Sequence, residues 1–323
     1  MPQAPDFWSR PGWLSDLLMP LGYGYAAAGA MRRRLHHPWR ATVPVLCIGN
    51  LVAGGAGKTP VTLSLAHLLR AAGKAPHILS RGYGGSSSGP LRVDPARHNA
   101  AEVGDEALLL AQAAPTWIGG DRAASARAAI EASAEMLLLD DGFQNPTLHQ
   151  DFALLVIDAN YGLGNGRVIP AGPLREPAAT GFARAQAVAL IGGNAAGLAL
   201  GNKPVFKARL VPHDASDLAG KKTVAFAGLG RPEKFFATLR ELGAELVGTH
   251  AFPDHHAYRE AELARLMAEA SEQRAELITT EKDLVRLAAP WRDRVRALKV
   301  EIRWEDEAAL IRALAPFMIK AHG

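Results

Sequence analysis

A glycine-rich turn that ends in a lysine and a threonine follows an apolar run at residues 43–48. The turn consists of Gly54, Gly55, Ala56 and Gly57, and Lys58 and Thr59 follow it. Backbone N–H groups of such a turn converge on phosphate oxygens, the lysine neutralises their charge, and the hydroxyl reaches Mg²⁺. Val52 stands where the usual loop has its first glycine, so the positive-φ positions must come from the glycines nearer the lysine. We predict a phosphate-binding loop here, with an ordinary strand-to-helix turn as the alternative.

Two adjacent carboxylates, Asp140 and Asp141, provide a place for a metal ion. They follow four apolar residues in the run EMLLLDDGFQ, which is typical of a buried strand. A phosphate loop needs a carboxylate at the end of a neighbouring strand to hold the Mg²⁺ shell, and adjacent acids are costly to bury without a cation. The acids and the loop together predict a nucleoside triphosphate and Mg²⁺, whereas the acids alone also suit a solvated turn. ATP is favoured over GTP, because NKPV at Asn202 lacks the acid of the guanine-reading N-K-x-D pattern and TEKD at Thr280 has the wrong spacing.

A kinase also needs a group that accepts the proton of the attacking hydroxyl. Candidates lie in the runs EVGDEALLL and FPDHHAYRE, and they are Asp105, Glu106, Asp254, His255 and His256. Asp105 begins a predicted helix, where a carboxylate can act simply as the N-cap, so its position leaves both roles open. A zinc site formed by these histidines with His250 is disfavoured, because no cysteine or regularly spaced ligand set accompanies them.

Alternating strand and helix patterns predict the scaffold that positions these groups. From residue 43 onward, apolar runs of the kind buried on both faces of a sheet alternate with segments of helical periodicity. We therefore expect an α/β fold with a doubly wound, mostly parallel sheet like that of P-loop NTPases, followed by a second, smaller α/β domain. The expected division is 1–40 for an N-terminal membrane-associated segment, 41–210 for the kinase domain and 211–323 for the smaller C-terminal domain.

The first 40 residues mix aromatic residues and leucines with arginines. Their longest uncharged run, residues 17–31, has 15 residues and contains Pro20, whereas a membrane span needs about 20. Most of the positive charge follows the apolar stretch, unlike the arrangement of a signal peptide. We expect an amphipathic helix that lies in a membrane interface, with a helix packed on the domain as the alternative. The residues concerned are Phe7, Trp8, Trp13, Leu14, Leu17, Leu18, Met19, Leu21, Tyr23 and Tyr25, then Arg32, Arg33, Arg34 and Arg40.

The composition of the whole chain is ordinary for a globular protein. Its 323 residues are 48% hydrophobic and 21% charged, which is enough for two domains with their own cores. The net charge of +4 produces no basic field that would attract nucleic acid. The single cysteine, Cys47, excludes an internal disulfide and fits a reducing cytosolic environment.

Several short motifs occur in this chain in one order: the glycine loop, GDE, DDGFQ, NGRVIPAGPLREP, FPDHHAY and TTEKD. This combination resembles the tetraacyldisaccharide 4'-kinase family, the lipid A 4'-kinases of Gram-negative bacteria, over nearly the whole chain. The resemblance implies ATP-dependent phosphorylation of the 4'-hydroxyl of a tetraacylated glucosamine disaccharide 1-phosphate. It also implies a peripheral position on the cytoplasmic face of the bacterial inner membrane. The implied partners are a lipid A precursor and the membrane surface, with no nucleic acid.

The resemblance implies roles for individual residues as well. Lys58 contacts the β- and γ-phosphates of ATP and Thr59 contacts Mg²⁺. Asp105 accepts the proton with His255 as its partner, and His256 is the adjacent alternative. The positions tied to Mg²⁺ and the active site are Asp140, Asp141, Gln144 and Glu176. Further site residues are Tyr83, Glu106, Arg122 and Arg175, of which the arginines suit phosphate groups.

A membrane-docked P-loop ATPase or GTPase switch is the rival interpretation. It would share the loop and the N-terminal helix, but it would have no need of the histidine motif near residue 255. A switch hydrolyses its nucleotide slowly without lipid, whereas a kinase depends on its lipid acceptor.

Overall fold

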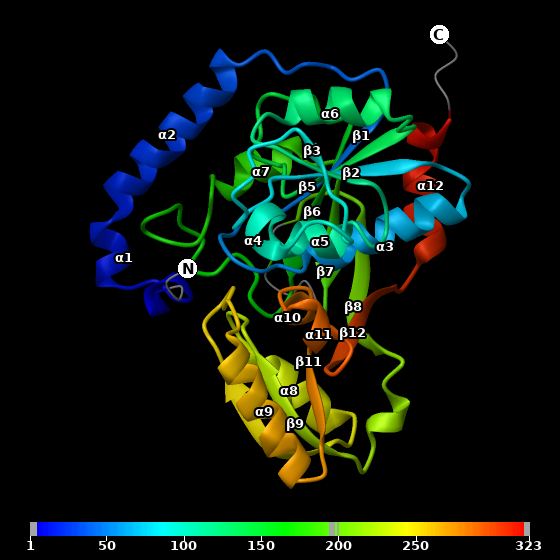
Figure 1. Cartoon of the computed structure of the whole chain (residues 1–323). Helices are drawn as coiled ribbons and strands as arrows, with labels where there is room; N and C mark the ends of the chain where they lie inside the picture. Colours follow the sequence, from blue (N-terminus) through cyan, green and yellow to red (C-terminus); the bar gives the residue numbers. More distant parts are fainter. Residues whose placement is uncertain (1–4, 194–197, 199, 320–323) are drawn as a thin grey trace.

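The computed structural model, which describes residues 5–193, 198 and 200–319, has the expected α/β architecture (Figure 1). A larger unit carries the first strands of the chain, and a smaller unit lies below it in the view of Figure 1. The strands of the larger unit are β1 Val45–Gly49, β2 Pro76–Ser80, β3 Leu91–Arg92, β4 Thr116–Ile118, β5 Met136–Asp140, β6 Phe152–Asp158, β7 Ala187–Ile191 and β8 Val205–His213. Its helices are α3 Lys58–Ala71, α4 Ala100–Val103, α5 Asp105–Leu110, α6 Arg122–Glu131, α7 Ala178–Arg184 and α12 Glu307–Met318.

The smaller unit repeats the alternation of strands and helices. Its elements are η2 Ser216–Leu218, β9 Lys222–Ala227, α8 Pro232–Glu241, β10 Glu245–Ala251, α9 Glu260–Glu272, β11 Glu276–Thr280, α10 Glu281–Leu284, α11 Ala289–Arg292 and β12 Arg296–Trp304. The described strands join one 12-stranded sheet in the order β10-β9-β11-β12-β8-β7-β6-β1-β5-β2-β4-β3. Most neighbours are parallel, and β12 with β8 and β3 with β4 are the antiparallel pairs among the described strands.

Strand β1 lies at the centre of the larger unit, with β5 on one side and β6 on the other, all parallel. Successive β1 side chains alternate between two apolar cores, because neighbouring residues of a strand point to opposite faces. Leu46 and Ile48 pack with α3 on one face, and Val45 and Cys47 pack with α6 and α7 on the other. The register pairs Ile48 with Asp140. The turn after β1 therefore lies beside the carboxylate that ends β5.

The two units are connected by β8 and by the long strand β12. Residues 296–298 of β12 pair with β11 of the smaller unit, and residues 299–304 pair with β8 of the larger one. Beyond β12 the chain returns to the larger unit, where Leu310 and Leu314 of α12 are buried in the same core as Leu46 and Ile48. The division of the chain at residues 210 and 211 stays a prediction.

The N-terminal segment forms η1 Asp6–Trp8, α1 Trp13–Leu17 and α2 Met19–Leu35 along the outside of the larger unit (Figure 1). It is fastened to the loop at residues 165–171. Trp8 Nε1 donates to the Pro170 carbonyl at 3.0 Å, and Arg167 forms an ion pair with Asp16 at 2.5 Å. Among the described helices, none has both the length and the apolar character that crossing a bilayer requires.

The return of α12 to the first core generates a stability prediction. Leu314→Ala should lower the free energy of unfolding by about 2–5 kcal/mol, because the leucine is fully buried and its removal leaves a cavity. Leu35→Ala on α2 is the matched control, since Leu35 is 69% exposed, and it should change stability by less than about 0.5 kcal/mol. Urea unfolding of the full chain measures both changes. Equal stabilities of the two variants would contradict the packing of α12.

Candidate active site

The turn after β1 has the backbone conformation of a phosphate loop. Gly54 and Gly57 have positive φ angles of 125° and 84°, as the sequence required of this region, whereas Gly55 does not. Gly57 is the left-handed N-cap of α3, so the helix begins at Lys58. Thr59 follows in the first turn of α3. The N-terminal end of this helix, with its unpaired N–H groups, faces the turn and favours an anion there.

Asp140 ends β5 beside this loop and is only 2% exposed. The hydroxyl of Thr62 on α3 donates to its Oδ1 at 2.8 Å. Burial, together with the negative charge of Glu106, raises the pKa of Asp140 to about 7. A carboxylate in this position gains from a cation that takes up its charge.

Asp141 lies in a different electrostatic environment, although it is the next residue. Its φ of 48° is left-handed, which is uncommon for an aspartate and directs the chain out of β5. Arg175 donates to its two oxygens at 2.9 and 3.3 Å, and Lys58 Nζ lies 3.6 Å away. Burial opposes ionisation, but Lys58 and Arg175 outweigh it and lower the pKa of Asp141. Asp141 thus holds the loop lysine and a second cation at the phosphate end of the site.

Gln144 and Glu176 form a second layer behind Asp141. Gln144 Nε2 donates to the Asn50 carbonyl at 3.0 Å and to Glu176 at 3.2 Å. Glu176 is buried, with Arg184 at 2.7 Å and Arg33 of α2 at 3.6 Å. Arg33 thus forms an ion pair with the body of the protein, and its predicted attraction to a membrane surface stays a prediction. Glu176 Oε2 has no hydrogen-bond partner in the described part of the chain, and Arg33 reaches it only as an ion pair. A metal role of Glu176 stays a prediction.

The proton-accepting candidates come together at the contact between the two units. His255 Nδ1 donates to Asp105 Oδ2 at 2.9 Å, although 150 positions separate the two residues. His255 has a left-handed φ of 59°, a conformation that needs support from its surroundings. His256 is turned away, because it stacks on Phe252 at 4.7 Å and pairs with Glu262 at 3.0 Å.

Asp105 is 4% exposed and is surrounded by positive charge from the smaller unit. Arg286 Nε donates to Asp105 Oδ2 at 2.6 Å, and its Nη2 forms an ion pair with the same carboxylate. Burial acts to raise the pKa of Asp105, but the His255 hydrogen bond and the charges of Lys282 and Arg286 hold it well below its usual range. Asp105 is therefore ionised. Asp105 is the first residue of α5, whose N-cap is Gly104. Its Oδ1 accepts the backbone N–H of Glu106 at 2.8 Å, as a carboxylate at a helix start can, and its Oδ2 bonds His255 and Arg286 in addition.

The other predicted residues lie around these two clusters. The Tyr83 ring is 5.8 Å from that of His255, and Glu106 accepts from Lys282 Nζ at 3.2 Å. Arg122 is buried at the start of α6, where burial and the neighbouring Arg81 lower its pKa to about 10. Its Nε has no hydrogen-bond partner in the described part of the chain.

Thr62, Lys282 and Arg286 contact the site but were not predicted from the sequence. Thr62 lies three residues beyond Thr59 on the same helix, so helical spacing could have indicated it. Lys282 belongs to the TTEKD motif, and Arg286 lies just beyond that motif. Neither spacing nor residue type shows that they reach Asp105, because that contact crosses between the units.

Within the described residues, no three His, Cys, Asp or Glu side chains converge as a complete metal site. Mg²⁺ commonly takes only one or two carboxylates and completes its shell with substrate phosphates and water. Asp140 is buried and has no cationic hydrogen-bond partner among the residues that the structure describes, so it fits such a ligand, and Thr59 supplies a hydroxyl at the neighbouring helix start. The residues present thus fit a magnesium–nucleotide pair rather than a permanently bound metal.

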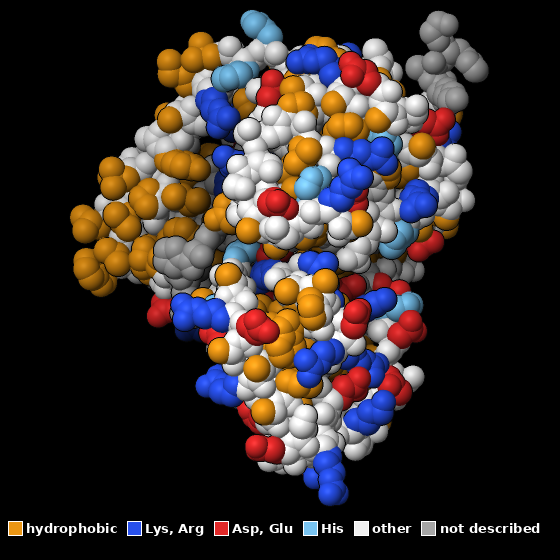
Figure 2. Space-filling model, viewed as in Figure 1, with side chains coloured by type: hydrophobic (Ala, Val, Ile, Leu, Met, Phe, Trp, Pro, Cys, Tyr) orange, Lys and Arg blue, Asp and Glu red, His pale blue; other side chains and the backbone are white. Residues whose placement is uncertain are grey.

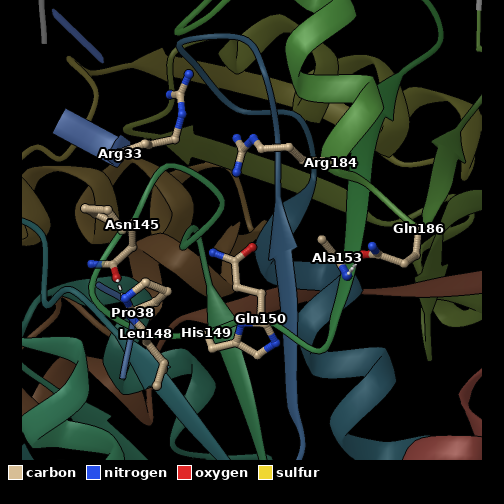
Figure 3. A pocket seen from close by; sticks show the side chains of 10 residues that line it. Arg33, Pro38, Asn145, Leu148, His149, Gln150, Ala153, Arg184 and Gln186 are labelled. Carbon is tan, nitrogen blue, oxygen red and sulfur yellow. Dashed lines mark hydrogen bonds between the residues drawn. The ribbon is translucent and has the colours of Figure 1, made fainter. Parts of the chain in front are cut away.

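A cavity of about 300 Å³ lies apart from these two side-chain clusters (Figure 3). Figure 3 shows Arg33 and Arg184 at one side of it and Asn145, His149 and Gln150 at the other. Lys58, Asp105, Asp140 and His255 are not among the residues that line it.

Comparison with known proteins identifies the family of this site. The family model for tetraacyldisaccharide-1-P 4'-kinase, LpxK, matches residues 14–318. The chain belongs to the tetraacyldisaccharide-1-P 4'-kinase family. A tetraacyldisaccharide 4'-kinase of Rhodospirillum centenum is 56% identical over 326 residues, covering 98% of this chain and 97% of that protein. One of Gluconacetobacter diazotrophicus is 54% identical over 325 residues, covering 98% and 99%.

A solved structure of the same family agrees with the fold. The LpxK of Aquifex aeolicus, crystallised as an "apo" form in complex with ATP, is 30% identical and superposes with a TM-score of 0.78, covering 95% of this chain and 100% of that one. The tetraacyldisaccharide-1-P 4'-kinase fold is thus shared over both units. The chain is an enzyme of this kinase family, as its motifs predicted.

The buried carboxylate of Asp140 generates a prediction about pH and stability. Its pKa is raised in the folded protein from 3.8 to about 7, so stability without metal should fall as pH rises through this window. Asp140→Asn cannot ionise and keeps an oxygen for the Thr62 hydroxyl. The wild type should lose on the order of 2–3 kcal/mol of unfolding free energy between pH 5 and pH 8, and the variant should not. Urea unfolding in EDTA measures both. Asp293→Asn, at an exposed site, is the control, and an unchanged pH dependence in Asp140→Asn would contradict the assignment.

Proposed function

We propose that this chain transfers the γ-phosphoryl group of ATP to the 4'-hydroxyl of a tetraacylated glucosamine disaccharide 1-phosphate, a step of lipid A biosynthesis. The observation that carries the mechanism is the hydrogen bond of 2.9 Å between Asp105 and His255. It gives the site a group that can take a hydroxyl proton, which a nucleotide switch does not need. Family membership supports the acceptor, and the phosphate loop supports the donor.

The phosphate end of the proposed reaction is built from the loop and the acids beside it. The backbone N–H groups of the loop and Lys58 bind the β- and γ-phosphates, and Arg175 adds positive charge next to Asp141. Asp140 and Thr59 are the proposed ligands of Mg²⁺, which when bound neutralises charge that develops on the phosphate oxygens. These groups hold the phosphates in place and disperse their charge.

The acceptor end is the Asp105–His255 pair. Asp105 Oδ2 already accepts from His255 and Arg286, whereas Oδ1 accepts the backbone N–H of Glu106 at 2.8 Å. Oδ1 is therefore the oxygen proposed to orient the 4'-hydroxyl and receive its proton. Little charge builds up on the attacking oxygen in a loose phosphoryl-transfer transition state. A carboxylate whose pKa is held low can consequently serve, because the proton moves late in the reaction.

The dependence of ATP consumption on lipid tests this function. We expect ATP loss to be strongly stimulated by the tetraacylated disaccharide 1-phosphate, with a product that carries one additional phosphate in its mass spectrum. The same lipid already phosphorylated at the 4' position is the control and should not stimulate. Slow hydrolysis of ATP or GTP that is indifferent to the lipid would instead indicate a switch.

Lys58→Ala and Asp105→Ala should impair the enzyme in different ways. Loss of Lys58 should weaken both ATP binding and turnover, because the lysine contacts the nucleotide in our proposal. Loss of Asp105 should lower kcat by roughly 10²–10⁴ with ATP binding largely kept. Steady-state kinetics and equilibrium ATP binding measure the two effects. A near-normal kcat for Asp105→Ala would exclude it as the proton acceptor.

We further propose that the N-terminal segment attaches the enzyme to the cytoplasmic face of the bacterial inner membrane. Exposed apolar side chains cover the outer side of this segment (Figure 2). They are Trp13, Leu17, Leu21, Tyr23, Tyr25, Met31 and Leu35. Positions 13 and 17 of α1 are four residues apart, as are positions 21 and 25 of α2, so each pair shares one side of its helix. Such apolar sides are expected of helices lying in an interface. The apolar residues lie on the same part of the chain that is joined to the loop before Arg175.

Charge contributes less to this proposed attachment than the four arginines suggest. Arg33 faces Glu176, and Arg40 lies 3.3 Å from Asp151, which leaves Arg32 and Arg34 as the more available charges. Each adds about 1 kcal/mol near an anionic surface. A large apolar side chain that is fully withdrawn from water adds about 1.5–3 kcal/mol, so a few partly inserted residues outweigh the charges.

High salt should therefore release only part of the enzyme from membranes, because salt screens charge and leaves apolar insertion in place. Detergent should release the remainder. Leu17→Ser/Leu21→Ser should weaken attachment to anionic vesicles and raise the KM for lipid, whereas Arg32→Gln/Arg34→Gln should matter less at physiological salt. Vesicle flotation measures the attachment. Complete release by about 1 M salt, at which the Debye length is about 3 Å, would show that charge alone holds the protein.

A further inference from the structure

Arg286 connects the two units of the protein at the acceptor end of the site. It lies just after α10 in the smaller unit, and its side chain is only 5% exposed. Its Nε donates to Asp105 Oδ2 of the larger unit at 2.6 Å. On the other side, its Nη1 donates to Asp283 at 2.7 Å and to the Gly228 carbonyl at 2.9 Å. One planar guanidinium thus contacts Asp105 and a buried anchor at the same time.

The anchor, Asp283, is completely buried and its hydrogen bonds are made within the smaller unit. Its Oδ1 accepts from the backbone N–H of Gly228 at 3.0 Å and from the Tyr258 hydroxyl at 2.8 Å. Its Oδ2 accepts from the Thr280 hydroxyl at 2.6 Å. A carboxylate with this many donors is fixed in place, and it fixes the orientation of Arg286.

The same anchor supports the loop that carries His255. The backbone N–H of His255 donates to the Gly228 carbonyl at 3.3 Å, the carbonyl that also accepts from Arg286. Apolar packing reinforces this contact, because Val285 is buried in the cluster that includes Val103 and Leu108 of the larger unit. Arg286 is therefore held beside both members of the catalytic pair.

We propose that Arg286 is a positioning residue, which holds the Asp105 carboxylate ionised and aligned on His255 across the contact between the two units. This inference rests on the proposed function, because it assumes that Asp105 receives the hydroxyl proton. Charge and shape both matter. An arginine offers a rigid fork that reaches two carboxylates, whereas a lysine in its place offers a single ammonium group.

The charged groups around the pair define what Arg286 contributes. Lys282 lies 3.4 Å from His255 Nε2 and 3.2 Å from Glu106, and Asp254 lies 3.8 Å from His255 Nε2. Lys282 is thus shared with Glu106, while Arg286 contacts Asp105 directly. Burial favours the neutral form of Asp105, and the His255 hydrogen bond, Lys282 and Arg286 oppose it. Without Arg286 the pKa of Asp105 should rise. When the pH is lowered, the variant should therefore lose activity at a higher pH than the wild type does.

The test compares Arg286→Met and Arg286→Lys by kcat, the KM for ATP and the pH dependence of kcat. Arg286→Met should lower kcat about 10²-fold, the typical cost of misplaced catalytic groups. It should also move the acidic limb of the pH–kcat profile, where activity falls with falling pH, up by about one pH unit or more. Arg286→Lys should keep the limb near its wild-type position and lower kcat only about tenfold, because charge is kept and the fork is lost. The KM for ATP should change less than about threefold in both, since the phosphate loop lies on the other unit.

A control at a site away from the pair separates positioning from a general loss of structure. Arg294→Met removes an exposed arginine that stacks on Trp291 at 4.8 Å, and it should be indistinguishable from wild type. Thermal unfolding checks the fold of every variant. If Arg286→Met does not fold, Arg286→Lys tests the proposal by itself. A lower kcat with an unchanged acidic limb of the pH–kcat profile would support it, and a wild-type kcat would overturn it.

A wild-type limb and a kcat within about threefold in Arg286→Met would overturn the proposal. A limb that moves as far in Arg286→Lys as in Arg286→Met would overturn it too, because charge would then not be what holds Asp105 ionised. Asp105→Ala in the same assay distinguishes the two levels of the account. Full activity of Asp105→Ala refutes the proposed mechanism itself, whereas an inactive Asp105→Ala with an unaffected Arg286→Met refutes only the role of Arg286.

Discussion

Asp105 is a buried carboxylate, and the groups that compensate its charge lie in the other unit of the protein. A charge withdrawn from water is tolerated only when donors and opposite charge replace the lost hydration, and removing one partner of such a pair costs about 3–5 kcal/mol. His255 and Arg286 supply that compensation from elements more than 100 positions away. The Asp105–His255 hydrogen bond therefore exists only while the two units are in contact. Val285, buried against the larger unit, adds the apolar part of the same contact.

The sheet explains how distant segments meet at this point. Parallel pairing of β1 and β5 brings the phosphate loop beside Asp140, and the antiparallel pair of β8 and β12 carries the smaller unit on the same sheet. The loop at residues 165–171 connects the N-terminal segment to the region before Arg175, where the phosphate end begins. The exposed apolar surface, the phosphate loop and the proton acceptor are thus fixed to one framework.

Local patterns were sufficient to predict the parts of the site whose chemistry is carried by neighbouring residues. The strand before the glycine turn, the left-handed glycines at 54 and 57 and the helix that follows result from short-range sterics and periodicity. Asp105 and His255 were paired through a family resemblance rather than from spacing, since nothing local relates them. Arg286 was missed because its bond to Asp105 crosses between the units, and the ion pair of Arg33 with Glu176 was not foreseen because the two residues are remote in sequence. The packing of α12 on the core around Leu46 and Ile48 could not be predicted from periodicity either. Periodicity shows which face of a helix is apolar, but not what that face packs against.

A double-mutant cycle on kcat tests the central claim, that two residues from different units act as one proton-accepting pair. Asp105→Ala, His255→Ala and the double variant would be compared in the lipid-dependent kinase assay, with ATP binding and thermal unfolding as checks of the fold. Residues that work as a unit give strongly non-additive losses. We predict that the double variant is no more than about threefold slower than the slower single variant. Losses in kcat that simply multiply would show that Asp105 and His255 act independently, and the account of the acceptor site would be wrong.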